Sequence, residues 1–287
     1  MERYVAWVLN FDAEEELASP VARKTASAAM TARLASLADR AVGLVAPGDL
    51  VVRDGVDARG FVGRAWCPTP SALDRLARAG AEAPIAPSLE ILRRANDRAF
   101  SAELGQTLPG AALATSRVEV ERMVARGGDW LMKRAFGFAG RGRRKVHAGT
   151  LVEADARWVD ASFREGALQV EPWVECLTDF ALHGHLDERG ALRLGAPTAQ
   201  RCDAYGAWQL SELARSDDLS PDEASALTRE ATAAARALHA IGYHGPFGVD
   251  AYRWRDPETS SALFNPRGEI NARYSMGWSV GMRGWRP

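Results

Sequence analysis

The segment that most constrains the fold is the basic, glycine-rich stretch Leu131–Val146, because its glycines lead into a strand-like run. Six basic residues and no acidic residue lie between positions 130 and 152. The glycine spacing matches neither G-x-G-x-x-G nor the P-loop motif, and both of those lead into a helix. Here the glycines are succeeded by a basic run that ends at Val146 and has the character of a strand. The sequence therefore predicts a hairpin flap.

Such a flap is suited to holding an anion. Gly137, Gly140 and Gly142 have no Cβ, so their backbone N–H groups can approach phosphate oxygens closely. Lys133, on the strand that enters the flap, would add a point charge. Taken alone, the loop is equally well explained as a solvated hairpin tip. A protein kinase is excluded, because the H-R-D-x-x-x-x-N and D-F-G motifs are missing.

Acidic and amide side chains occur near the end of the sequence, in two strand-like runs. Glu269, Asn271 and Arg273 alternate along the last run, so they share one face of a strand. Asp250 lies among apolar residues in the run before it, where an unpaired carboxylate would be costly. Oxygen ligands of this kind suit Mg²⁺. A set of salt bridges to arginines remains the alternative explanation.

These features, in this order, resemble the ATP-grasp superfamily, which combines a strand lysine, a glycine flap, an acidic hinge (here "VEPWVE"), a strand carboxylate and an E-x-N-x-R motif. The resemblance covers roughly residues 96–275. It implies an α/β fold in which two α+β lobes enclose the nucleotide after an N-terminal α/β preATP-grasp domain. We place that domain at 1–90 and the ATP-grasp domain at 91–287, with its small, flap-bearing lobe at about 115–175.

The resemblance also assigns roles around ATP. Lys133 would contact the α- and β-phosphates, and the hinge would hold the adenine through Glu171, Trp173 and Val174. Asp179 would contact the ribose, with Glu175 as the competing candidate. Arg98 stands where many members have a lysine.

Further roles concern the metal and the second substrate. Asp250, Glu269 and Asn271 would bind Mg²⁺, with Mn²⁺ as an alternative ion, and Arg273 would steady a substrate carboxylate or its acyl phosphate. Arg201 is a candidate for the phosphate in transfer, and a surface arginine is an equally good explanation.

The implied activity is that of an ATP-dependent ligase. A small-molecule or peptide carboxylate would be activated as an acyl phosphate and attacked by an amine, releasing ADP and phosphate. Three alternatives stay open: a phosphotransferase that stops at phosphorylation, a non-catalytic nucleotide-binding module, and a nucleic-acid binder that relies on "RGRRK".

Composition narrows these alternatives. The chain has 287 residues with 36 basic and 37 acidic side chains, so no general basic excess points to nucleic acid. Three widely spaced cysteines form no metal motif, and no apolar run is long enough to cross a membrane. The acidic start of the sequence does not fit a signal peptide. We therefore expect a soluble, cytoplasmic protein.

Local patterns predict individual elements. Residues 21–42 and 89–104 are expected to be helical, and a third helix should begin after the Ser220 cap, with Glu223 closing a capping box. The alternating segment 179–195 should form a hairpin, with His183 and His185 on its surface.

Overall fold

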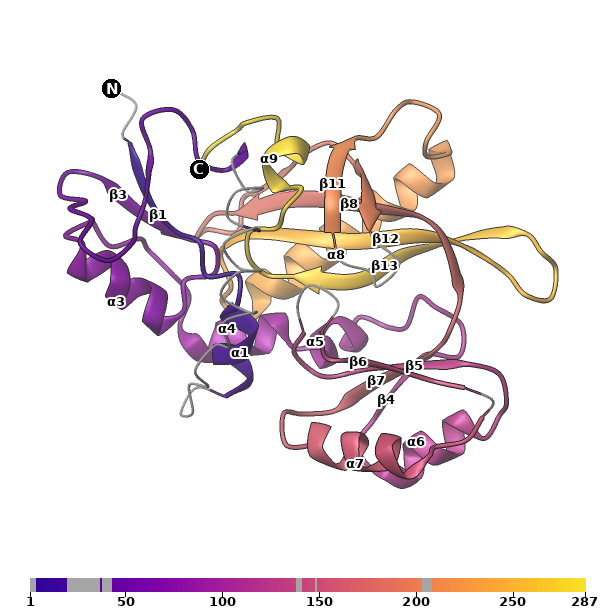
Figure 1. Ribbon diagram of the computed structural model, residues 1–287. Coiled ribbons are helices and arrows are strands. Elements are labelled where there is room, and N and C mark those ends of the chain that lie inside the picture. Colours follow the sequence, from indigo (N-terminus) through magenta and orange to yellow (C-terminus); the bar gives the residue numbers. More distant parts are fainter. Residues whose placement is uncertain (1–3, 20–36, 38–42, 138–140, 148, 203–207) are drawn as a thin grey trace.

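The computed structural model describes residues 4–19, 37, 43–137, 141–147, 149–202 and 208–287 (Figure 1). The predicted helix at 21–42 lies, apart from position 37, outside these residues, and so does Gly140. The described part of the chain forms three β-sheets. None of its helices is long and apolar enough to cross a membrane.

The first sheet is parallel and belongs to the N-terminal part of the chain. Its strand order is β2-β1-β3, formed by Leu50–Val51, Val5–Val8 and Val62–Ala65. Helix α3 (Pro70–Arg78) packs its buried Leu76 against this sheet. Helix α1 (Ala13–Ala18) comes after β1 and points toward the rest of the molecule.

The second sheet is antiparallel, with the order β4-β7-β5-β6. Its strands are Ala112–Ala114, Leu168–Pro172, Trp130–Lys133 and Arg143–Val146. Helices α6 (Arg117–Val124) and α7 (Glu153–Ser162) cover the face that carries Met132. Strands β5 and β6 pair with Lys133 opposite Arg143, which confirms the predicted hairpin flap.

The third sheet is a six-stranded antiparallel sheet, ordered β11-β10-β8-β12-β13 with β9 beside β8. Its strands, in chain order from β8 to β13, are Glu175–Leu186, Leu192–Leu194, Thr198–Cys202, Trp208–Leu213, Gly245–Arg255 and Ala262–Asn271. Helix α8 (Pro221–Ala240) packs on the apolar face that includes Phe180 and Val249. The predicted capping box of Ser220 and Glu223 is confirmed at its start.

Two local predictions are wrong. The segment 89–104 is not one helix but two, α4 (Leu89–Asn96) and α5 (Arg98–Glu103), because Asp97 is extended and caps α5 through the Ala99 N–H. His183 is not on the surface, since its side chain is 1% exposed beneath the segment that contains α9 (Trp278–Gly281). The hairpin that carries it is confirmed.

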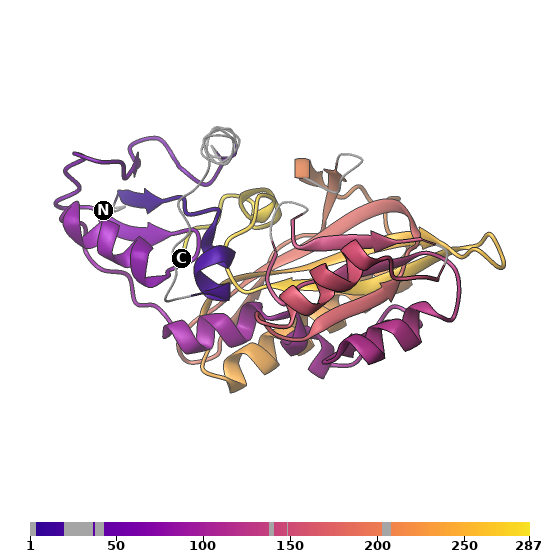
Figure 2. The same ribbon diagram turned by 60° about the horizontal axis from the view of Figure 1, so that its bottom comes forward.

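The small, second sheet and the large, third sheet lie one above the other in Figure 1, with α6 and α7 on the outer side of the small sheet. Figure 2, in which the bottom of the molecule is turned forward, shows the N-terminal sheet to one side of these two sheets. The faces of the two sheets that the helices leave uncovered therefore face each other, and the charges of Lys133 and Arg143 on the small sheet act on Glu269 of the large sheet.

Candidate functional site

Strand alternation decides which side chains lie between the two sheets. In the small sheet, Met132 faces the helices, so its neighbours Leu131 and Lys133 face the large sheet. Glu171 is opposite Leu131 and shares this face. In the large sheet, Val249 packs toward α8, so Asp250 faces the small sheet.

Asp250, Glu269 and Asn271 form one cluster on the large sheet, as the sequence predicts. Asp250 is directly opposite Glu269 in the β12–β13 ladder, and Asn271 is diagonal to Asp250. The Asn271 Nδ2 donates to Asp250 Oδ2 at 2.8 Å. Burial and the nearby charge of Glu269 raise the pKa of Asp250 to about 7. Two carboxylates are thus held close together.

Cations surround the second of these carboxylates. Burial alone would raise the pKa of Glu269, but the charges of Arg98, Lys133, Arg143 and Arg273 outweigh it and lower the pKa below its ordinary value. Glu269 is therefore stabilised in its ionised form, whereas the ionised form of Asp250 is destabilised by burial and by Glu269.

Lys133 is buried in the small sheet and has a carboxylate partner. Its Nζ lies 2.5 Å from Glu171 Oε1. Gln169, on the same strand face, donates to Glu171 Oε2 at 3.1 Å. Lys133, Glu171 and Gln169 thus form one polar group on this face of the small sheet.

Arg98 connects the two lobes. Its Nη2 donates to Glu269 Oε1 at 2.9 Å, and its Nη1 donates to the Arg134 carbonyl at 2.6 Å. Its Nε is buried without a partner among the described residues. The break at Asp97 places Arg98 at the start of α5, where its side chain reaches the base of the flap.

The flap requires glycine for steric reasons. A Cβ on Gly137 would lie 2.6 Å from the Arg141 carbonyl oxygen and 3.3 Å from Arg98 Nη1. Gly142 has a φ of +73°, and its carbonyl accepts from the Arg134 N–H at 2.8 Å. These contacts hold the two ends of the flap close to Arg98.

The hinge residues divide between the interior and the surface. Val174 packs with Leu108 and Trp254 in a small apolar cluster. Trp173 is 46% exposed, with Lys145 Nζ 4.2 Å from its ring centroid, and its N–H donates to the Asp129 carbonyl. Val174 therefore packs in an apolar cluster, whereas Trp173 lies at the surface.

Asp179 and its competitor Glu175 have different surroundings on β8. Asp179 is paired with Gln200 and accepts a weak hydrogen bond from Cys176 Sγ at 3.4 Å. Glu175 forms an exposed ion pair with Arg255 at 3.0 Å. The structure brings Asp179, and not Glu175, to the neighbourhood of Gln200 and Asp250.

Arg201 does not reach this face. Its neighbour Gln200 donates to Asp250 Oδ1 at 3.3 Å, so alternation along β10 directs Arg201 to the opposite side. The Arg201 side chain is 73% exposed, and the ion-pair partner that the structure gives it is Glu212, at 3.9 Å. The surface explanation for Arg201 is the one that the geometry favours, and Gln200 is a site residue that sequence analysis missed.

Arg273 is engaged with the N-terminal part of the chain. Its Nε donates to Glu14 Oε1 at 2.5 Å, its Nη2 pairs with the same oxygen, and its Nη1 donates to the Tyr274 carbonyl. The guanidinium is thus occupied by Glu14 and by the Tyr274 carbonyl. Sequence analysis missed Glu14, because no local pattern links α1 to the end of β13.

The donor chemistry of the Asp250 cluster fits Mg²⁺. It offers two carboxylates, and the amide of Asn271 points its nitrogen at Asp250, which leaves the amide oxygen as a further possible ligand. A divalent cation would offset the burial of the Asp250 carboxylate and its repulsion by Glu269, the two causes that raise its pKa. Within the described ranges, no group of three or more His, Cys, Asp or Glu side chains is arranged to hold a metal.

The sequence matches no protein-family model and no curated protein. Its structure does match solved enzymes. Biotin carboxylase from Campylobacter jejuni gives a TM-score of 0.57 at 16% identity, over 98% of this chain and 62% of that one. D-alanyl-alanine synthetase A from Vibrio cholerae gives a TM-score of 0.54 at 12% identity, over 98% of this chain and 92% of that one. Pyruvate carboxylase from Rhizobium etli gives a TM-score of 0.55 at 19% identity, over 97% of this chain.

These enzymes are built on the same lobed framework that the described residues form. The chain has the ATP-grasp fold. It spans only 25% of the pyruvate carboxylase chain and 62% of the biotin carboxylase chain. At such identities the likeness defines the ATP-grasp fold and leaves activity and substrates to be argued from the site.

Proposed function

We propose that this protein is an ATP-dependent ligase that activates a carboxylate as an acyl phosphate for attack by an amine. The observation that carries the proposal is the convergence of Lys133 and Arg98 on the same cleft as Asp250, Glu269 and Asn271. Cations for phosphates and oxygen ligands for a metal thus face one another from two lobes. We assign residues 1–90 to a preATP-grasp-like unit, 91–287 to the ATP-grasp domain, about 115–175 to its small lobe, and the protein to the cytoplasm.

The nucleotide would lie along the cleft from the hinge to the flap. Glu171 and Val174 would contact the adenine, Asp179 the ribose, and Lys133 the phosphates. Binding the phosphates requires Lys133 to exchange its contact with Glu171 for phosphate oxygens, which frees the Glu171 carboxylate to accept from the adenine amino group. Arg98 and Arg143 add positive charge where the γ-phosphate would lie.

Asp250, Glu269 and Asn271 would hold Mg²⁺, which when bound neutralises charge on the phosphate oxygens. The residues of the chain do the rest: Lys133 and Arg98 fix the phosphates, and the flap excludes water. The γ-phosphoryl group passes to the substrate carboxylate and ADP departs. The amine then attacks the acyl carbon, phosphate leaves, and the ammonium proton is lost. Exclusion of water matters because an acyl phosphate hydrolyses readily.

An ADP-release assay tests this function. Mixtures of carboxylic acids and amines are screened with ATP and Mg²⁺, comparing wild type with Glu269→Gln and with the exposed control Glu90→Gln. We expect ADP and phosphate in equal amounts only when an acid and an amine are both present, and only in wild type and the control. A stable phosphorylated acid formed without any amine would refute the ligase assignment.

A further inference from the structure

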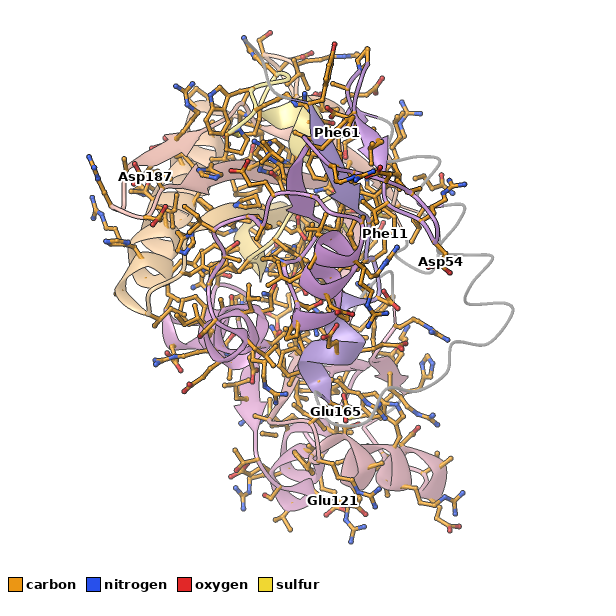
Figure 3. All side chains as sticks on the ribbon, turned by 90° about the vertical axis from the view of Figure 1, so that its left-hand side faces the viewer. Phe11, Asp54, Phe61, Glu121, Glu165 and Asp187 are labelled. Carbon is orange, nitrogen blue, oxygen red and sulfur yellow. The ribbon has the colours of Figure 1, made fainter. Side chains whose placement is uncertain are left out.

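A pocket of about 430 Å³ lies between α1 and the base of the flap. The acidic side is formed by Asp12, Glu14, Glu15 and Glu16, and the flap contributes Phe136 and Gly142. In Figure 3, which views this side of the molecule, Phe11 marks the approach to α1 and Glu165 marks the opposite rim. This volume is within the range of pockets that bind small molecules.

The cations that line this pocket are already engaged. Arg134 Nη1 lies 2.9 Å from Glu165 Oε1, and Arg75 Nη2 donates to the Val52 carbonyl at 3.0 Å. Arg141 Nη1 lies 3.8 Å from Glu15 Oε1. Because each of these arginines already contacts an oxygen of the protein, they are poorly suited to bind an incoming anion.

Two of the acids, Glu14 and Asp12, keep unused acceptor capacity, whereas Glu16 accepts from Ser71 and Glu15 pairs with Arg141. Glu14 is 5% exposed, and while Oε1 accepts from Arg273, its buried Oε2 has no partner among the described residues. Asp12 is half-buried and makes no side-chain hydrogen bond to α1. A buried carboxylate oxygen without a donor costs about 1–3 kcal/mol or more, which a bound donor would recover.

The pocket adjoins the proposed reaction centre. Glu14 is held by Arg273, two residues beyond Asn271, and the charge of Glu269 acts on it. Gly137, which also lines the pocket, lies against Arg98, because a Cβ there would be 3.3 Å from Arg98 Nη1. A molecule bound at Glu14 would therefore lie beside the γ-phosphate end of the cleft and not at the hinge.

We infer that this pocket receives the amine substrate as a primary ammonium compound, with Glu14 Oε2 and Asp12 as its acceptors and Arg273 as the positioning residue for Glu14. The inference rests on the proposed ligase function and assigns the side from which the nucleophile enters. A carboxylate substrate is disfavoured here, because the unshared oxygens are themselves anionic. The acid substrate must then enter from another part of the cleft.

Thermal shift experiments test the pocket separately from the nucleotide site. Wild type is first saturated with Mg²⁺ and a non-hydrolysable ATP analogue, and its stabilisation by the analogue is recorded. A panel of probes is then added: ethylamine, ethanolamine, putrescine and glycinamide, with ethanol and ethylene glycol as neutral counterparts. Each measurement is repeated for Asp12→Asn, Glu14→Gln and the exposed control Glu90→Gln.

We expect at least one amine, and neither alcohol, to stabilise the analogue-bound wild type and the Glu90→Gln control. Losing one charged hydrogen-bond acceptor should weaken that amine roughly ten- to hundredfold. If Glu14→Gln does not fold, because Arg273 loses its partner, Asp12→Asn carries the test alone. Amine binding that is unchanged in Asp12→Asn and in any folded Glu14→Gln protein would overturn the inference, as would no amine response. A normal analogue shift in those same proteins would show that the nucleotide site is intact and that only the amine assignment fails.

Discussion

Acid should destabilise this protein through one buried histidine, His183. Its ring packs against three glycines: a Cβ on Gly281 would lie 2.7 Å from Nδ1, one on Gly277 2.9 Å from Cε1, and one on Gly248 3.2 Å from Cδ2. Nδ1 has no partner among the described residues. Burial lowers the pKa of His183 from 6.5 to about 4.

Whether acid stabilises or destabilises the protein through His183 depends on which state, folded or unfolded, binds the proton more readily. In the unfolded chain the imidazole binds a proton near pH 6.5, whereas in the folded protein it resists protonation down to about pH 4. The unfolded state therefore binds more protons between these values, so stability is full above pH 6.5 and falls as the pH drops toward 4. A shift of this size corresponds to about 3 kcal/mol in total, and roughly 2 kcal/mol between pH 7 and pH 5.

Urea unfolding at these two pH values, monitored by circular dichroism, measures the effect. The wild type should lose roughly 2 kcal/mol more between pH 7 and pH 5 than His183→Gln, because the glutamine at position 183 does not titrate. His239→Gln serves as the control, because His239 is exposed on α8. An equal loss of stability in wild type and His183→Gln would refute the argument that burial holds this imidazole neutral.

Three further changes have defined outcomes. Lys133→Met should weaken binding of the Mg²⁺–ATP analogue roughly tenfold or more, measured by calorimetry, since a buried cation in the cleft is lost. Gly142→Ala should destabilise the flap by about 1 kcal/mol, seen as a lower melting temperature, because φ is +73° and the new Cβ would lie 3.0 Å from the Phe136 carbonyl oxygen. Ser220→Ala should cost about 1 kcal/mol in urea unfolding through loss of the α8 cap. An unchanged value in any of these measurements contradicts the corresponding argument.

Sequence was informative where the signal was local. The absence of a helix after the glycines identified the flap, and the Ser220 capping box located α8. Alternation in the last strand placed Glu269 and Asn271 on one face, and the structure adds Asp250 opposite Glu269. Each of these inferences needs only backbone periodicity or the chemistry of neighbouring residues.

Sequence failed where distant elements decide the outcome. The helix break at Asp97 depends on Asn96, whose side chain forms two hydrogen bonds with the backbone of Ala272 far along the chain. The pairing of Glu14 with Arg273 joins residues 259 positions apart. The side of the sheet on which Arg201 lies depends on how β10 pairs with β8, and the sequence of β10 alone does not fix that register.

The central claim is that the cleft between the two sheets binds ATP with a divalent metal. Thermal stabilisation by Mg²⁺ with a non-hydrolysable ATP analogue tests it most directly, comparing wild type, Lys133→Ala and Glu269→Ala. At about 100 times its dissociation constant the analogue should stabilise wild type by about 2.7 kcal/mol, and both variants should lose most of this gain. Absence of a shift in wild type, or equal shifts in all three proteins, would contradict the claim.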